Sequence, residues 1–135
     1  MNGLNPQFAV IGTTFVESFY PMFDSLTFKT DENAKRQLLS FYHENAMLSF
    51  EGSQIQGNEN IVAKFISLPF KSLTRVVTTV DSQPIADGGV AIMVVGQLKT
   101  DDDSPHPFSH VFILRPNSGS FHICHEFFRL GLHNI

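Results

Sequence analysis

The chain has 135 residues, of which 42% are apolar and 16% are charged. It therefore has enough apolar surface to build a core and too little charge to be a disordered tail. Nine basic against thirteen acidic side chains give a formal charge of −4, which is the wrong sign for a protein that binds the phosphates of nucleic acid.

The apolar runs and the cysteine content bear on membranes and on the cellular compartment. No run approaches the roughly 20 apolar residues of a membrane-spanning helix, and we expect no targeting segment. A lone Cys124 cannot close an intrachain disulfide and favours a reducing compartment. We expect one domain over residues 1–135, with no nucleic-acid or membrane partner, in the cytoplasm or nucleus.

The aromatic composition is unusual, with fourteen Phe, two Tyr and no Trp. Phenylalanine has no hydrogen-bonding group, so it fills apolar volume or presents its ring to an apolar partner. Two interpretations stay open. Either all of these rings belong to the core, or some are exposed for binding.

Apolar residues at helical spacing predict three helices. The first runs from Phe8 to Met22 over four to five turns, and Pro21 should kink or loosen its last turn because it lacks a backbone donor. A second helix is predicted from Glu32 to Phe41, after a loop. A third is predicted from Glu59 to Leu68, with Asn58 as its cap.

The other segments predict strands. Residues 47–52 and 55–57 suggest a small hairpin. Beyond it the apolar period becomes two, and turn residues separate four strands at Leu73–Val80, Val90–Leu98, Phe108–Leu114 and Phe121–Leu130. Helices followed by hairpin-connected strands predict an α+β fold, with the helices on one face of a curved antiparallel sheet. The uncovered face is a candidate for dimerisation.

The local clusters of reactive residues are weak signals for catalysis or metal binding. His122, Cys124 and His125 are close on one strand, where side chains alternate between faces, and no partner elsewhere completes a metal site or a nucleophile pair. We expect no metal, cofactor or catalytic residue. The acidic run 101–103 at a hairpin tip is more informative, because it is either a solvated turn or a contact for a basic partner.

Five blocks, in the right order over nearly the whole chain, resemble the nuclear transport factor 2 family. They are Phe50–Gly57, Ser67–Phe70, Asp81–Pro84, Val94–Asp103 and Phe128–Asn134. The resemblance implies a cone, in which a curved antiparallel sheet wraps around three helices and leaves an apolar cavity. It also implies a homodimer packed sheet against sheet.

The same resemblance implies a carrier, without a catalytic step, that brings the small GTPase Ran into the nucleus in its GDP form. An aromatic side chain of Ran would enter the cavity, and basic side chains of Ran would meet acidic groups at its rim. The rim acids would be Glu51, Asp101 and Asp103. The cavity wall would include Phe50, Leu68, Leu73, Phe127 and Phe128.

A second activity implied by the family is binding of phenylalanine-glycine repeats of nucleoporins, in a groove between the subunits. The matching positions are Phe8, Ile11, Gln83, Pro84 and Ile135. The chain would then visit the cytoplasm, the nucleus and the nuclear pore. Two departures stand out: Phe8 and Phe50 occupy positions where the family often has tryptophan, and the loop at residues 25–32 is longer than usual. The smaller ring of Phe8 should weaken repeat binding.

Two alternatives remain open. One is a related module that pairs with a large mRNA-export receptor, although the intact Asp101 and Asp103 pattern argues against it. The other is an isomerase or dehydratase on the same cone, for which His110, His125 and Glu126 are the candidate acids and bases.

Overall fold

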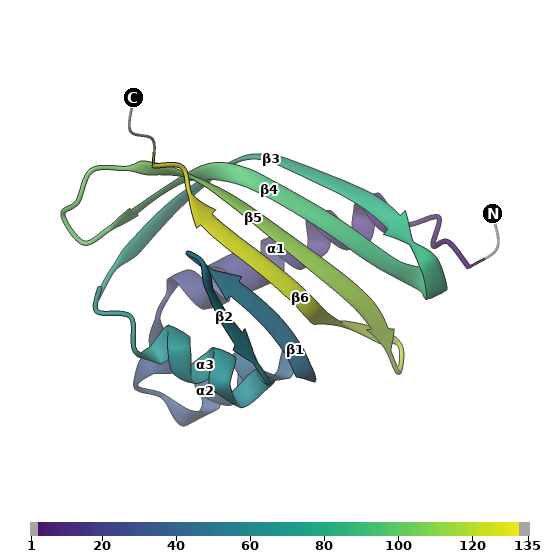
Figure 1. Cartoon of the computed structure of the whole chain (residues 1–135), viewed down its shortest axis with the longest axis horizontal. Helices are drawn as coiled ribbons and strands as arrows, with labels where there is room; N and C mark the ends of the chain where they lie inside the picture. Colours follow the sequence, from purple (N-terminus) through teal and green to yellow (C-terminus); the bar gives the residue numbers. More distant parts are fainter. Residues whose placement is uncertain (1–2, 133–135) are drawn as a thin grey trace.

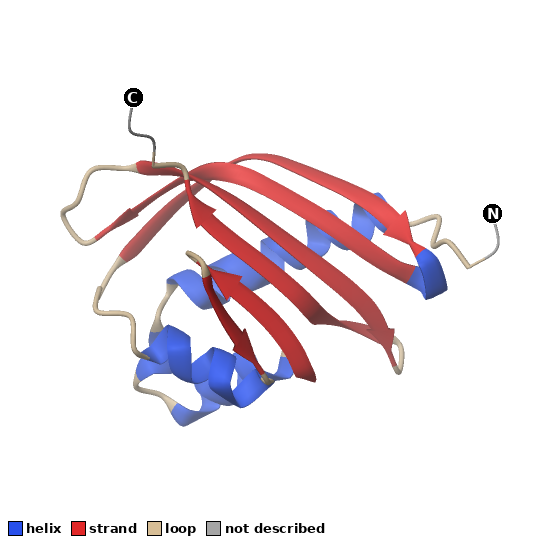
Figure 2. Cartoon of the chain, in the orientation of Figure 1, coloured by secondary structure: helices blue, strands red, loops and turns tan. Residues whose placement is uncertain are grey.

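The computed structural model of the chain describes residues 3–132, in which helices lie against one face of a curved sheet (Figures 1 and 2). Its three α-helices are the predicted ones, α1 (Phe8–Asp24), α2 (Glu32–Ser40) and α3 (Asn58–Ile66). Helix α3 ends two residues before the predicted Leu68. Its N-cap is Gly57 rather than Asn58, because Gly57 has the positive φ of 95° with which the chain turns into the helix.

Helix α1 continues three residues past Pro21. Pro21 removes a hydrogen bond to the carbonyl of Glu17, and both residues are exposed, so water can replace that bond on the outer side of the helix. The inner side is apolar and packs into the sheet. Its buried side chains are Phe15, Val16, Phe19, Tyr20 and Phe23.

The segment between α1 and α2, which the sequence predicted to be a loop, contains a 3-10 turn, η1 (Thr27–Lys29). Leu26 precedes it in the left-handed conformation, with φ of 57°, and is buried. The Phe28 ring is also buried and packs 5.2 Å from the ring of Phe23, centroid to centroid. Two apolar anchors therefore hold this longer segment against the core.

The six strands form one sheet in the order β2-β1-β6-β5-β4-β3. Their bounds are β1 (Tyr42–Phe50), β2 (Ser53–Gln56), β3 (Leu73–Ile85), β4 (Gly89–Thr100), β5 (His106–Asn117) and β6 (Ser120–Leu130). The α+β class and the curved sheet are confirmed. The sheet is mixed rather than wholly antiparallel, because β1 and β6 run parallel. Strand β1 begins five residues before the predicted start, in a polar stretch that hid it.

Two register irregularities interrupt the antiparallel pairing of the long strands. One lies at Thr78 of β3, between the pairs that Val77 and Thr79 make with β4, and the other lies at Cys124 of β6. Such bulges bend a strand and increase its twist. Near the first, the backbones approach so closely that a Cβ on Gly96 would lie 2.1 Å from the carbonyl oxygen of Val76.

The core lies between α1 and the inner face of the sheet, where Phe15 and Phe19 pack against Phe112 with ring centroids 4.9 and 5.3 Å apart. The interpretation that all of the phenylalanine rings belong to the core is wrong, and a role of the exposed rings in binding stays a prediction. Seven rings are buried, at positions 15, 19, 23, 28, 65, 108 and 112, whereas Phe127 is 49% exposed. Within residues 3–132, no helix combines the length and apolar character needed to cross a membrane.

Candidate binding cavity and its acidic mouth

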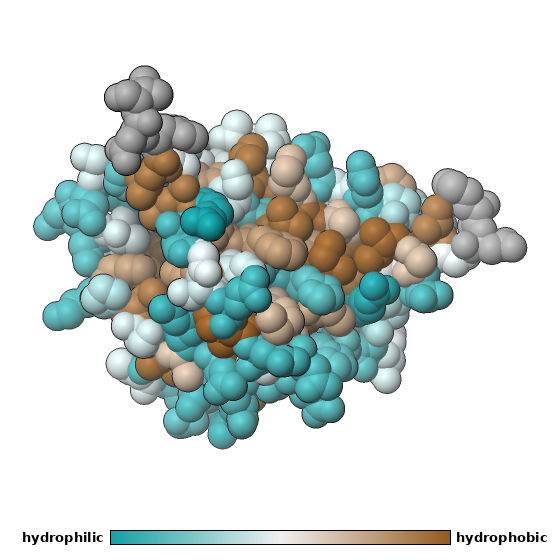
Figure 3. Space-filling model, in the orientation of Figure 1, coloured by the Kyte–Doolittle hydropathy of each residue, from teal (hydrophilic) through white to brown (hydrophobic). Residues whose placement is uncertain are grey.

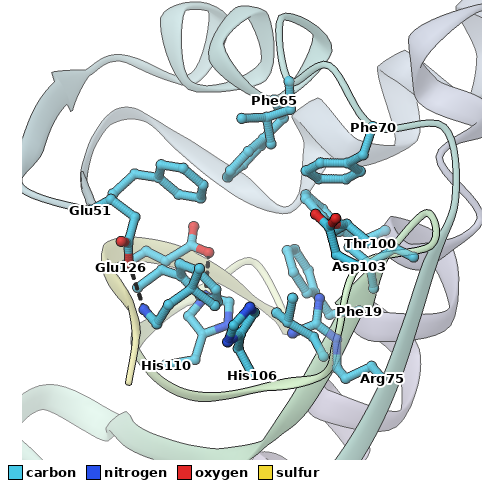
Figure 4. Close-up of a pocket in the computed structure, with 17 residues that line it drawn as sticks. Phe19, Glu51, Phe65, Phe70, Arg75, Thr100, Asp103, His106, His110 and Glu126 are labelled. Atoms are coloured by element: carbon cyan, nitrogen blue, oxygen red, sulfur yellow. Dashed lines mark hydrogen bonds and ion pairs between the residues drawn. The ribbon is translucent and has the colours of Figure 1, made fainter. Parts of the chain in front are cut away.

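A cavity of about 340 Å³ lies between the inner face of the sheet, the end of α1 and α3 (Figure 4). Its walls are mostly aromatic and aliphatic, and they come from elements that are distant in the sequence. The apolar lining consists of Phe19, Phe23, Phe50, Phe65, Leu68, Phe70, Leu73, Leu98, Phe128 and Leu130. Four of the five predicted wall residues are among them.

The fifth predicted wall residue, Phe127, is a correction. Side chains alternate along β6, so Glu126 and Phe128 face the cavity while Phe127 points to the outer face of the sheet. The resemblance placed both Phe127 and Phe128 in the wall. Adjacent side chains of a strand face opposite sides of the sheet, so only one of the two rings can face the cavity.

Two carboxylates of the lining, Glu51 and Asp103, stand at different sides of the cavity mouth (Figure 4), whereas the third, Glu126, lies deeper. Glu51 follows β1 in a left-handed conformation with φ of 49°, and its Oε1 accepts a hydrogen bond of 2.5 Å from the backbone N–H of Leu130. Asp103 stands in the turn between β4 and β5 and is exposed. The mouth of an apolar cavity therefore carries two negative charges.

Asp101, the third predicted rim acid, is placed differently. It is absent from the lining, and its Oδ1 accepts hydrogen bonds from the backbone N–H groups of Lys71 and Ser72, at 2.9 and 3.0 Å. These bonds stabilise the carboxylate and lower the pKa of Asp101. Asp101 thus ties the β4–β5 turn to the segment between α3 and β3.

The deep side of the cavity holds a chain of polar side chains that the sequence did not reveal as a unit. The Tyr42 hydroxyl donates to Oε1 of Glu126 at 2.5 Å, and Nε2 of His110 lies 2.6 Å from Oε2 of the same carboxylate. The carboxylate only accepts, so Nε2 of His110 carries the proton. Its Nδ1 then accepts from the hydroxyl of Tyr20 at 2.8 Å.

Burial explains why the histidine and the two tyrosines of this hydrogen-bonded group are neutral. It lowers the pKa of His110 and raises the pKa values of Tyr20 and Tyr42, since charged forms are poorly solvated there. The structure thus brings together two of the three predicted acid–base candidates, His110 and Glu126. His125 is exposed and stands apart from them.

An ion pair also joins α1 to β3. Arg75 donates from Nη2 and Nε to Asp24, at 2.8 and 3.0 Å, and its guanidinium carbon lies 3.9 Å from the centroid of the Tyr20 ring. The two charged residues are 51 positions apart, so no local spacing marks them as partners. The one sequence signal was a basic residue within an apolar strand.

The residues predicted for repeat binding lie near the N-terminal end of α1. Phe8 and Ile11 are half-buried on the helix, and Gln83 and Pro84 lie on β3. The two elements approach closely there, because a Cβ on Gly12 would meet Oγ of Ser82 at 1.9 Å. Ile135 lies outside the described residues.

Among residues 3–132, no group of three or more His, Cys, Asp or Glu could hold a metal ion.

Comparison with known proteins decides the family. The sequence model of the nuclear transport factor 2 (NTF2) domain matches residues 11–130. The chain belongs to the nuclear transport factor 2 family. Relatives include the protein named probable nuclear transport factor 2 of Caenorhabditis elegans, 44% identical over 133 residues, which are 96% of this chain and 97% of that protein.

Two further matches agree. The nuclear transport factor 2 of Saccharomyces cerevisiae is 38% identical over 126 residues, covering 92% of this chain and 94% of its own length. The solved nuclear transport factor 2 of Cryptosporidium parvum superposes with a TM-score of 0.80 at 40% identity, over 95% of this chain and 98% of that one. The resemblance and the cone fold are confirmed. The chain has a nuclear transport role and is not an enzyme, so the isomerase or dehydratase alternative is wrong.

Acidification should destabilise the fold through His110. Its pKa in the folded chain lies below the value of about 6.5 for an unfolded chain, so falling pH protonates the unfolded state first. The stability that the neutral ring contributes is present above pH 6.5 and is lost as pH falls toward the folded pKa. We predict that urea titrations between pH 7.5 and 5.0 show a falling free energy of unfolding, with a contribution of up to about 1.4 kcal/mol per pH unit.

The control is His110→Gln, which keeps an amide donor and acceptor but does not titrate. This variant should lose that part of the pH dependence and retain the contribution of the other histidines. Equal slopes in the two proteins would show that the buried ring does not control acid stability.

Proposed function

We propose that the chain is a homodimeric carrier that binds Ran-GDP in its cavity and phenylalanine-glycine repeats of nucleoporins on its surface. It would move between cytoplasm and nucleus through the pore and deliver Ran to the nucleus. The observation that supports this most is the combination of an apolar cavity with two carboxylates at its mouth. The family membership favours the same function.

The cavity suits an aromatic side chain whose neighbours are basic. An inserted ring would be buried against Phe50, Leu68, Leu73 and Phe128, and apolar burial would supply most of the affinity. A lysine or arginine beside that ring would meet Glu51 and Asp103 at the mouth. Opposite charges there steer the encounter and fix the register of the complex.

Asp101 and Phe127 take other parts in this proposal. Asp101 holds the turn that presents Asp103, and its charge adds to the negative field around the mouth.

Phe127 belongs to the outer face, which we propose as the dimer interface. Its Cα partner on β5 is Val111, and the partner of Val111 on β4 is Met93, so three apolar side chains form a row across the strands.

The outer face is apolar beyond this row. Figure 3 shows hydrophobic side chains gathered along the middle of the view, over the strands, with hydrophilic side chains around them. Val76 and Met93 are exposed there with Phe127. An apolar surface of this kind favours a second copy of the chain as its cover.

The repeat-binding site is proposed at the N-terminal end of α1 and the adjacent part of β3. Phe8 and Ile11 offer half-buried apolar side chains, and Pro84 lies half-buried on the strand that α1 approaches. A phenylalanine ring of a repeat would pack there against the second subunit. The smaller ring of Phe8, compared with tryptophan, should give weaker binding.

The rim contact is tested by Asp103→Lys with Asp102→Lys as its matched control. Asp103 lines the cavity, whereas its exposed neighbour Asp102 does not. Asp103→Lys would oppose a basic side chain of Ran, so calorimetry should show at least a 100-fold loss of affinity, about 3 kcal/mol. Its free energy of unfolding should change by about 0.5 kcal/mol or less.

Asp102→Lys should lose only a several-fold, salt-dependent part of the affinity, because it changes the distant field alone. Titrations at two salt concentrations separate these effects. Equal losses in both variants would mean that the acidic run acts as diffuse charge and that Asp103 makes no direct contact.

Dimerisation is tested by light scattering, which should give a mass of about 30 kDa, twice the chain mass of 15.1 kDa. Phe127→Asp places a charge in the proposed interface and should give a monomer, whereas Thr14→Asp on the exposed side of α1 should not. A wild-type monomer at micromolar concentration would rule out the homodimer. If that monomer assembled with a large mRNA-export receptor, the alternative function would be favoured.

A further inference from the structure

The longer segment at residues 25–32 has no role in the proposed function, although it is firmly attached beside the cavity. Its 3-10 turn η1 is anchored by two buried side chains, Leu26 and Phe28. The Phe28 ring packs against Phe23, which belongs to the cavity lining. Lys29 is the last residue of this turn, so its side chain starts from a backbone position that the core holds in place.

Lys29 extends from η1 to the segment between α3 and β3. Its Nζ donates hydrogen bonds to the backbone carbonyls of Leu68 and Phe70, at 2.5 and 2.7 Å, and lies 5.3 Å from the centroid of the Phe70 ring. Hydrogen bonds from a charged donor are stronger than those between neutral groups. One ammonium group therefore joins backbone positions that are 39 and 41 residues from it in the sequence.

The segment that receives these bonds, residues 67–72, forms part of the cavity wall and is called the wall segment below. Leu68 and Phe70 both line the cavity, where Figure 4 shows the Phe70 ring. Pro69 between them has no backbone N–H. Among residues 3–132, no backbone N–H donates to the carbonyls of Leu68 or Phe70. The ammonium group is thus the protein donor that fixes both carbonyls.

The other end of the wall segment is held by Asp101. Its Oδ1 accepts from the backbone N–H groups of Lys71 and Ser72, and its own N–H donates to the carbonyl of Ser72 at 3.0 Å. A cation from η1 and an anion from the β4–β5 turn therefore fix the wall segment at two places. Loss of the Lys29 bonds would release the end that faces the cavity and leave the end at Asp101 attached.

We propose that Lys29 is a positioning residue for the cavity, which holds the wall segment in the conformation that an entering aromatic side chain of Ran meets. This inference rests on the proposed function and deepens it, because it names a residue outside the lining that sets the affinity of the cavity. A wall that is already ordered avoids the loss of conformational entropy that a mobile wall would suffer on binding.

Charge alone predicts the opposite effect of removing Lys29. The mouth of the cavity carries the carboxylates of Glu51 and Asp103, which we expect to face basic side chains of Ran. Removal of a cation from the wall segment makes the surroundings more negative, and this should strengthen the attraction for a basic partner. A fall in affinity on removal of Lys29 would therefore indicate lost positioning rather than lost charge.

The test compares Lys29→Met with Lys71→Met in calorimetric titrations with Ran-GDP. Both changes remove one positive charge and keep much of the apolar stem, but Lys71 is exposed and bonds to Asp101 through its backbone N–H. Lys29→Met should lose at least fivefold in affinity, whereas Lys71→Met should keep or exceed the wild-type affinity. Unchanged affinity in Lys29→Met, or equal losses in the two variants, would overturn the proposal.

Backbone NMR order parameters give a second measurement, in which Ran is absent. The amide of Phe70 should be rigid in wild type, with a value of about 0.85, and should fall below about 0.6 in Lys29→Met. The amides of Ile92 and Phe112 in the core should stay rigid in both, which separates local release from unfolding. Equal values for Phe70 would refute the role of Lys29 even if wild type binds Ran-GDP. A wild type that binds no Ran-GDP would instead contradict the proposed function, and the order parameters would still decide whether Lys29 holds the wall.

Discussion

The position of α1 inside the curve of the sheet is the constraint on which the cavity depends. Phe15 and Phe19 pack against Phe112, which buries the middle of the helix. Its last turns are held by polar links, Tyr20 to His110 and Asp24 to Arg75. Because Phe19 and Phe23 of the same helix form part of the cavity wall, these links fix the shape of the cavity as well as the helix.

Charge is arranged by depth around this helix. At the deep side every charge is paired or hydrogen-bonded, since Arg75 faces Asp24 and Glu126 accepts from two neutral donors. The walls above are apolar, and uncompensated carboxylates appear at the mouth. A site of this kind can bury an apolar group while it holds a cation at the edge, which is the recognition pattern that we propose for Ran. The hydrogen bonds of Asp101 matter because they fix the turn from which Asp103 reaches the mouth.

The sequence was informative wherever a local pattern decided the structure. The spacing of phenylalanines gave α1, and the period-two strands gave the long hairpins between Leu73 and Leu130. The start of β1 was missed because its first residues after Tyr42 are polar, and its parallel pairing with β6 joins segments far apart in the chain. The buried links are equally nonlocal, so no spacing could have paired Asp24 with Arg75.

At the candidate site, too, some residues were predicted correctly from the sequence and others were not. The family resemblance placed Phe50, Leu68, Leu73 and Phe128 in the wall and Glu51 and Asp103 at the mouth. It failed at Phe127, where strand parity decides between two adjacent rings, and at Asp101, whose carboxylate satisfies backbone donors of another loop. Both outcomes depend on exact register, which a pattern of residue types does not determine.

The most direct test of the carrier function is calorimetric titration of the wild-type chain with Ran loaded with GDP and with GTP. We predict saturable binding of the GDP form, one Ran for each chain, and no measurable binding of the GTP form. Absence of binding to Ran-GDP, or equal binding of both forms, would contradict the proposal that this cavity serves import of Ran-GDP.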